Sequence, residues 1–186
     1  NRGLVEADRA LVHFERAESN LHIFFSHFLA GTVNIRMGKN EEAFRRYQKA
    51  QEYARKTGDF DPNYKVLNEL GNAHRRSGNL EQAESYYREA IKLCREEGVI
   101  KEELFTTNNL AIIRKTQKKF PEALALYQSA LALAKKIPPK QRTKEEGYIY
   151  VNLSQMANKQ DKPQEALANG RLAFARFKDN GNPRER

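Results

Sequence analysis

The chain has 186 residues, of which 39% are hydrophobic and 31% charged, and its formal net charge at pH 7 is +9. It contains no apolar run of about 18 residues, so the sequence predicts no membrane-spanning helix. The single cysteine, Cys94, excludes an internal disulfide framework. It fits a reducing, cytoplasmic location, and we expect its thiol to be a small buried hydrophobe.

Alanines recur along the chain with a fixed period. Four of them stand at intervals of 40, 40 and 43 residues, and each is followed seven residues later by a second alanine. A small residue stands twelve positions before each leading alanine, and a tyrosine stands four positions after it in the first three copies. A period of about 20–50 residues is the signature of stacked repeats. In copy order, the leading alanines are Ala43, Ala83, Ala123 and Ala166, the second alanines are Ala50, Ala90, Ala130 and Ala173, the small residues are Gly31, Gly71, Ala111 and Ser154, and the aromatic position holds Tyr47, Tyr87, Tyr127 and Gly170.

The pattern predicts one helix–turn–helix unit in each copy, and no strands. Residues 1–19 are expected to form a half repeat, because Gly3, Ala7 and Ala10 stand 40 residues before equivalent positions of the first copy. This favours a piece cut from a longer protein, and a capping helix is the alternative. The prediction is a single domain over residues 1–186, with full repeats at 20–58, 59–98, 99–137 and 141–178 and a loose tail at 179–186.

The order of small residue, turn, alanine, aromatic and alanine resembles the tetratricopeptide repeat family, whose unit is a helix–turn–helix of about 34 residues. The period of 40 resembles the long-repeat subgroup found in kinesin light chains and bacterial peptide-sensing regulators. The resemblance covers nearly the whole chain. It implies an all-α fold, a right-handed α-solenoid of about nine helices.

This sequence departs from the family pattern at two places. Gly170 replaces the aromatic residue of the fourth repeat, so we expect that repeat to pack less well. The turn glycines Gly38 and Gly78 also have no counterpart in the third and fourth repeats, where Lys118 and Asp161 stand instead.

No constellation of residues for catalysis or metal binding is apparent. His22 and His27 are five residues apart and have no third ligand near them in the sequence. Neither a glycine-rich phosphate loop nor a Gly-x-Ser-x-Gly element occurs. We therefore expect no enzyme activity, no metal and no cofactor.

The resemblance implies a ligand groove on the first helix of each repeat. Asparagine amides in such a groove both donate and accept hydrogen bonds, which suits an extended peptide backbone. Arginines and lysines suit a carboxylate, and phenylalanines suit an apolar anchor. The alternatives are a solvated inner face for the polar residues and packing between helices for the phenylalanines. The implied groove residues are Lys65, Asn68, Asn72, Arg75, Arg76, Asn108, Lys115, Gln155 and Asn158, and the implied apolar anchor is Phe25, Phe28 and Phe105.

The sequence favours a scaffold that binds a protein or peptide, because repeat proteins hold partners on extended concave surfaces. The positive charge favours an acidic partner, whereas the absence of standard nucleic-acid-binding motifs does not favour nucleic acid. One alternative is a regulatory sensor domain cut from a larger signalling or transcription-regulating protein. Another is self-assembly into a homo-oligomer through an exposed N-terminal end.

Overall fold

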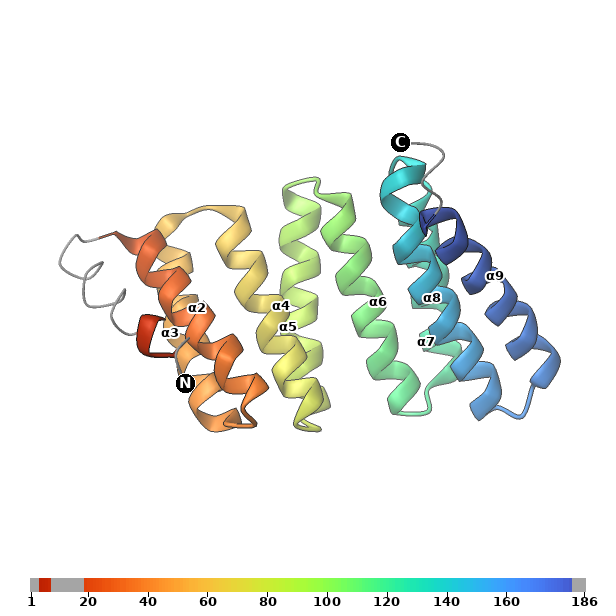
Figure 1. The fold of residues 1–186 in the computed structure, drawn as a ribbon, viewed down its shortest axis with the longest axis horizontal. Coiled ribbons are helices and arrows are strands. Elements are labelled where there is room, and N and C mark those ends of the chain that lie inside the picture. The colour runs from red at the N-terminus through yellow and green to blue at the C-terminus, as the bar shows by residue number, and fades with distance from the viewer. Residues whose placement is uncertain (1–3, 8–18, 182–186) are drawn as a thin grey trace. The chain divides into compact units, whose positions relative to one another are not determined.

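The structure is a computed structural model, and it describes residues 4–7 and 19–181 (Figure 1). All regular secondary structure in these residues is helical, so the all-α prediction is confirmed. Most of the expected half repeat at 1–19 and the end of the expected tail at 179–186 lie outside the described residues. The helices are α2 (Asn20–Arg36), α3 (Asn40–Thr57), α4 (Phe60–Arg76), α5 (Leu80–Glu96), α6 (Ile100–Thr116), α7 (Phe120–Ala134), α8 (Pro139–Lys159) and α9 (Pro163–Gly181), and residues 4–7 form a further helical turn.

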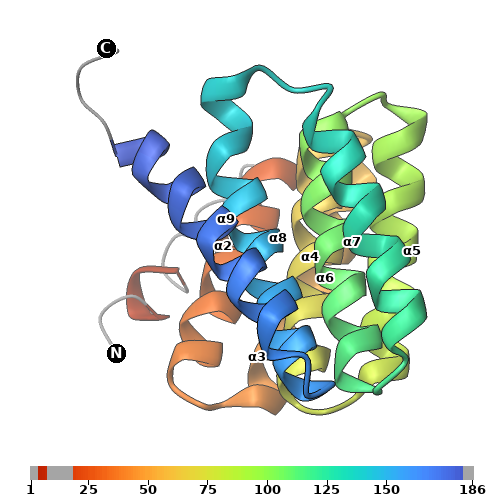
Figure 2. The ribbon, with the colours of Figure 1, turned by 90° about the vertical axis from the view of Figure 1, so that its right-hand side faces the viewer.

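The chain divides into two compact units, residues 1–93 and residues 94–186. In the first unit α2 packs along α3, α3 packs against α4, and α2 also touches α4. In the second unit α6 packs along α7, α7 against α8, and α8 along α9, while α6 also touches α8 (Figure 2). The division falls within α5, and the single domain expected from the sequence stays a prediction.

The small and aromatic positions of a repeat pack directly on each other. A Cβ atom added to Gly31 would lie 2.8 Å from the ring of Tyr47, and one added to Gly71 would lie 2.5 Å from the ring of Tyr87. Both distances are shorter than van der Waals contact, so these rings occupy the space that a side chain would need. The tyrosines are almost fully buried, as are the alanines of the repeat pattern. Glycine therefore allows the close approach of the two helices in these repeats.

The fourth helix pair replaces this contact rather than losing it. A Cβ added to Gly170 would meet only Ser154 Oγ, at 3.7 Å. However, a Cβ added to Gly147 would lie 2.7 Å from the ring of Phe177, so an aromatic side chain of α9 again packs on a glycine of α8. Ser154 contributes by donating a hydrogen bond of 2.8 Å to the Ala166 carbonyl. The expectation of weaker packing overlooked Phe177.

The turns within the repeats share one backbone conformation. Gly38 and Gly78 have φ values of 73° and 81°, and Lys118 and Asp161 keep the same left-handed region at 60° and 56°. In the first turn Lys39 N donates to the Asn34 carbonyl over 2.9 Å, and the equivalent bond in the third turn joins Lys119 N to the Arg114 carbonyl over 2.9 Å. This is the Schellman pattern, which satisfies the last carbonyls of a helix. The fold therefore imposes the left-handed turn even where the sequence lacks glycine.

The cysteine is structural. Cys94 lies at the end of α5 and is fully buried, as expected. Burial, together with the nearby carboxylates of Glu102 and Glu103, raises the pKa of the Cys94 thiol to about 12. The thiol is therefore protonated at neutral pH and does not act as a nucleophile.

Candidate functional site

The first helices of successive repeats contact each other within each unit. In the first unit α2 and α4 lie next to each other, and in the second unit α6 and α8 do so. Each of these helix pairs carries a pocket, which we name the α2/α4 pocket and the α6/α8 pocket. The α2/α4 pocket has a volume of about 280 Å³ and is lined by Phe28, Thr32, Ile35, Arg36, Tyr47, Glu69 and Arg76. The α6/α8 pocket has a volume of about 400 Å³ and is lined by Leu104, Phe105, Asn108, Ile112, Lys144, Glu145, Tyr148 and Asn152.

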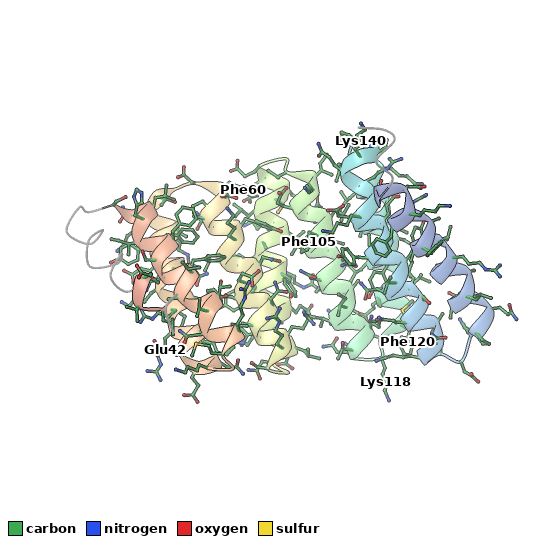
Figure 3. All side chains as sticks on the ribbon, in the orientation of Figure 1. Glu42, Phe60, Phe105, Lys118, Phe120 and Lys140 are labelled. Atoms are coloured by element: carbon green, nitrogen blue, oxygen red, sulfur yellow. The ribbon has the colours of Figure 1, made fainter. Side chains whose placement is uncertain are left out.

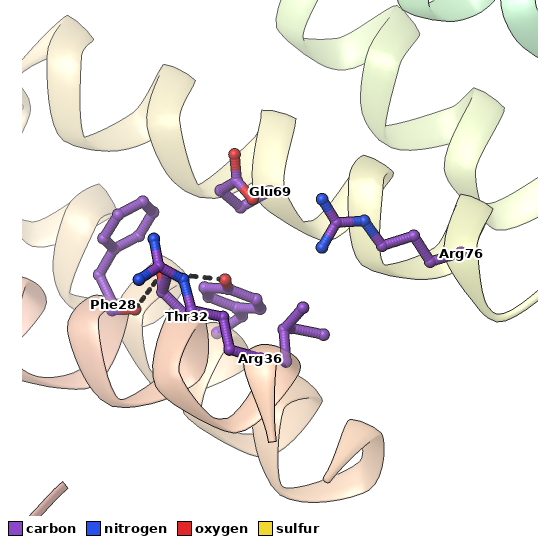
Figure 4. A pocket seen from close by; sticks show the side chains of 7 residues that line it. Phe28, Thr32, Arg36, Glu69 and Arg76 are labelled. Atoms are coloured by element: carbon purple, nitrogen blue, oxygen red, sulfur yellow. Dashed lines mark hydrogen bonds between the residues drawn. The ribbon is translucent and has the colours of Figure 1, made fainter. Parts of the chain in front are cut away.

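Two arginines and one carboxylate set the charge of the α2/α4 pocket. Arg36 extends from α2, and Arg76 and Glu69 extend from α4 toward the same hollow (Figure 4). Both arginines are exposed, and neither forms an ion pair with another described residue. Burial raises the pKa of Glu69, while a hydrogen bond of 3.2 Å from Asn72 and the nearby Arg76 act against that rise. The pocket therefore contains two cationic hydrogen-bond donors and one carboxyl group that is shielded from solvent.

The predicted anchor Phe28 forms part of this pocket. Its ring lies 5.8 Å from the Tyr47 ring, measured between centroids, and the Tyr47 hydroxyl is held 3.1 Å from Thr32 Oγ1. Phe25 does not line the pocket: its ring is 43% exposed, and the ammonium of Lys65 lies 5.9 Å from the ring centroid. Lys65 itself pairs with Asp61 at 2.5 Å.

The other predicted residues of α4 are in different environments. Asn72 Oδ1 accepts a hydrogen bond of 2.8 Å from the Tyr87 hydroxyl, and Asn72 Nδ2 donates to Glu69 Oε1 over 3.2 Å. Asn68 is buried. The Nε atom of Arg75 is shielded from solvent and has no hydrogen-bond partner among the described residues. Of the predicted α4 residues, Arg76 is the one that lines the pocket.

In the second unit, three predicted residues join a single hydrogen-bond network. The buried ammonium of Lys115 donates to Asn152 Oδ1 and to Gln155 Oε1, each over 2.9 Å. Asn152 Nδ2 in turn donates to Asn108 Oδ1 over 3.3 Å. Lys115 binds the oxygen of Asn152, so the NH₂ group of Asn152 faces the oxygen of Asn108. The side-chain amides of Asn152 and Asn108 are therefore both oriented, and the NH₂ group of Asn108 takes no part in this network.

The remaining predicted residues of this unit differ in position. Phe105, which Figure 3 labels, lies on α6; it lines the α6/α8 pocket and is 44% exposed. Asn158 is exposed near the end of α8 and does not line the pocket, and its carbonyl accepts a turn hydrogen bond of 3.1 Å from Asp161 N. The structure thus brings together Asn108, Lys115 and Gln155 but leaves Asn158 apart.

Sequence reasoning left out several residues that line these pockets. Glu69 precedes Asn72 and Arg76 by three and seven residues, and Glu145 precedes Tyr148 and Asn152 by the same spacings. Residues at those spacings share one face of a helix. That spacing was the available signal for both carboxylates.

Helix–turn–helix repeats in a fixed order define the class of this protein. A family model for the tetratricopeptide repeat matches residues 26–96, 64–136 and 102–179. The chain therefore belongs to the tetratricopeptide repeat family.

Solved structures share this fold over nearly the whole chain. BtubC (BKLC) from P. vanneervenii aligns with a TM-score of 0.80 at 20% identity, covering 96% of this chain and 73% of that one. A putative kinesin light chain from Podosopora anserina, with nearly identical TPR-like repeats, aligns at 0.72 and 14% identity, covering 96% and 87%. The Rap conjugation gene regulator of plasmid pLS20, in complex with the Phr* peptide, aligns at 0.63 and 18% identity, covering 95% and 57%.

These likenesses show the fold, and they confirm the predicted resemblance to kinesin light chains and bacterial peptide-sensing regulators. The chain spans little more than half the length of the pLS20 regulator. No curated protein sequence matches the chain.

Two further observations concern the described residues. None of their helices combines the length and apolar character that a membrane crossing requires. They also contain no group of three or more His, Cys, Asp or Glu side chains placed to hold a metal ion.

Proposed function

We propose that this protein is a non-enzymatic scaffold that binds a peptide segment of a protein partner, and that the α2/α4 pocket takes an acidic side chain next to an apolar one. The observation that carries the proposal is the pair Arg36 and Arg76, which extend into one pocket without an ion-pair partner among the described residues. Arginine binds carboxylates through paired, charge-assisted hydrogen bonds. Phe28, in the same pocket, supplies an apolar wall.

The α6/α8 pocket supports the same function through its amides. Asn108 lines this pocket, and its NH₂ group can donate a hydrogen bond to a peptide carbonyl. Lys115 acts as a positioning residue here, because it orients Asn108 through Asn152. A helical groove with oriented donors and apolar walls is suited to an extended peptide.

A library of acetylated, amidated decapeptides tests the proposal by affinity selection on the full chain, with bound peptides identified by mass spectrometry. We expect enrichment of peptides in which Asp or Glu neighbours an apolar residue. The double variant Arg36→Ala, Arg76→Ala should bind these peptides at least tenfold more weakly, because each charge-assisted hydrogen bond contributes about 1.5–3 kcal/mol.

The matched control is Arg45→Ala, Lys49→Ala, which removes the same charge from exposed positions of α3 outside the pocket. Arg45 and Lys49 form only surface ion pairs of 3.9 and 3.7 Å, so their loss should leave peptide binding nearly unchanged. If both double variants weakened peptide binding equally, the loss would come from the change in net charge and not from the pocket. No enriched peptide at all would contradict the scaffold function.

A regulatory sensor domain is the second candidate. It is favoured by the fold shared with the pLS20 regulator, whose structure holds a peptide and whose length this chain covers only in part. The test is the full-length gene: a flanking effector domain would support a sensor, and an open reading frame confined to these repeats would contradict it. Self-assembly through the N-terminal end and a cytoplasmic location stay predictions.

A further inference from the structure

The α6/α8 pocket has aromatic walls that are open to solvent. Phe105 on α6 and Tyr148 on α8 are 44% and 47% exposed, while Leu104 behind them is almost fully buried. The Tyr148 ring is braced by Phe177, with the ring centroids 5.4 Å apart in an edge-to-face arrangement. Two exposed rings beside one pocket provide faces against which a flat or extended side chain can pack.

A carboxylate oxygen without a hydrogen-bond partner belongs to a residue that lines the same pocket. Glu145 Oε2 is shielded from solvent and accepts no hydrogen bond from any described residue. A shielded carboxylate oxygen that lacks a donor is unfavourable, and a cationic donor that enters the pocket relieves this cost after a small rotation of the side chain. The charge of Glu145 thus gives the pocket a preference for cations over neutral groups of the same shape.

One wall of this pocket already has a cation near its aromatic ring. The Lys144 ammonium lies 6.0 Å from the centroid of the Tyr148 ring, within the range of a cation–π contact. Lys144 is exposed and lies on the pocket wall, so an incoming cation competes with it for the ring face. Its removal should therefore favour an external cation rather than disfavour it.

We propose that the α6/α8 pocket binds a basic side chain of the peptide, with arginine preferred over lysine. The guanidinium stacks on the rings of Phe105 and Tyr148 and donates to the Glu145 carboxylate. Arginine is preferred because its flat, weakly hydrated group stacks on rings and donates in pairs to a carboxylate. The inference deepens the proposed function and rests on it, and it assigns this pocket the opposite charge preference from the α2/α4 pocket.

NMR of the full chain with labelled methyl groups tests each pocket separately. The probes are N-acetyl-arginine amide, its neutral isostere N-acetyl-citrulline amide, and N-acetyl-glutamate amide. The methyl groups of Leu104 and Ile112 report on the α6/α8 pocket, and that of Ile35 reports on the α2/α4 pocket. We expect the arginine probe to shift Leu104 and Ile112 saturably, with an affinity about tenfold above that of the citrulline probe, since a charge-assisted bond replaces a neutral one.

Two variants of neighbouring residues should act in opposite directions. Glu145→Gln should abolish the preference for arginine over citrulline, and Lys144→Gln should strengthen binding of the arginine probe. Equal binding of the two probes to the unmodified chain, or an unchanged preference in Glu145→Gln, would overturn the inference. If the glutamate probe shifts Ile35 while the arginine probe shifts nothing, the inference fails and the proposed function stands. If neither probe binds its pocket, both fail.

Discussion

The Tyr87 hydroxyl donates a hydrogen bond of 2.8 Å to Asn72 Oδ1, on the residue that follows the glycine beneath the Tyr87 ring. In the first repeat Thr32 holds the equivalent position, and its Oγ1 lies 3.1 Å from the Tyr47 hydroxyl. In the third repeat this position is Ile112, and the buried Tyr127 hydroxyl has no partner within the described part of the chain. Burial raises the pKa of Tyr127, so this hydroxyl stays protonated.

Replacement by phenylalanine should affect stability differently at Tyr87, in the second repeat, and at Tyr127, in the third. Tyr87→Phe removes a hydrogen bond and leaves Asn72 Oδ1 without its donor, so we expect the free energy of unfolding to fall by about 0.5–1.5 kcal/mol. Tyr127→Phe removes a buried hydroxyl that lacks a partner, and should be neutral or stabilising by up to about 1 kcal/mol. Urea unfolding of both variants measures the difference. Equal losses in the two would show that the hydrogen bond to Asn72 contributes nothing.

The fourth helix pair offers a second matched comparison. Gly147→Ala places a Cβ within 2.7 Å of the Phe177 ring, which must then move, so we expect a loss of stability. The loss should be about 1–3 kcal/mol, as for other overpacked contacts. Gly170→Ala adds a Cβ in ordinary contact with Ser154 and should stabilise α9, since alanine exceeds glycine in helix propensity by about 1 kcal/mol. Thermal unfolding separates the two, and a stabilising Gly147→Ala would contradict the contact with Phe177.

The turn between α6 and α7 should become more stable with the glycine that its counterparts have. Lys118 has a φ of 60°, a region that costs a residue with a Cβ about 1–2 kcal/mol. Glycine avoids this cost but loses about 0.5–1 kcal/mol through the greater freedom of the unfolded chain. Lys118→Gly should therefore raise the free energy of unfolding by a few tenths to about 1 kcal/mol. Figure 3 shows Lys118 at this turn.

Lys118→Ala is the control, because it removes the same charged side chain but keeps the Cβ. It should leave stability nearly unchanged. If alanine stabilised the protein as much as glycine, the gain would come from removing the lysine, and not from relief of the left-handed conformation.

His74 should make the protein less stable in mild acid. Its ring is stacked on Tyr86 and tilted against Phe44, at centroid distances of 5.4 and 4.5 Å. Burial lowers the pKa of His74 from its ordinary value of 6.5. The unfolded state therefore binds the proton at a higher pH than the folded state does. Stability is fully present above about pH 6.5 and falls as the pH drops from there toward the folded pKa.

A variant without this titration isolates the contribution of His74. His74→Phe keeps an aromatic ring in the stack and should lose less stability between pH 7.5 and pH 5.5 than the unmodified protein, as measured by urea unfolding at both values. His22 and His27 are present in both proteins, so they contribute equally. An identical pH dependence in the variant would show that His74 has the same pKa in both states.

The repeat architecture could be predicted because small residues recur at a fixed period in the sequence. Ala43, Ala83 and Ala123 mark equivalent buried positions, and the spacing alone located the helix pairs. The packing of Phe177 on Gly147 could not be found in this way, because it lies outside the register of the first three repeats. The repeat register aligns Lys118 and Asp161 with the turn glycines, but the sequence did not show that the left-handed conformation is kept without glycine.

The candidate site could be predicted only as a face. Helical spacing placed Lys115 and Gln155 on the groove side of their helices, but it did not indicate that Asn152 would join them to Asn108. Which polar groups pair depends on side-chain rotamers and on the distance between helices, and neither is periodic. Asn72 shows the same limit, because the amide predicted to meet a ligand accepts the Tyr87 hydroxyl.

The contact between Phe177 and Gly147 has a geometric origin and a mechanical consequence. Gly147 precedes Ser154 by seven residues, and Phe177 follows Gly170 by seven, so the aromatic contact has slid by one heptad along both helices. Seven residues fall only about 20° short of two full turns, so the slide preserves the facing sides of α8 and α9. Since Phe177 also braces Tyr148, one ring anchors the last helix and shapes a wall of the α6/α8 pocket. A substitution that displaces the Phe177 ring should therefore change both the packing of α9 on α8 and the position of the Tyr148 ring.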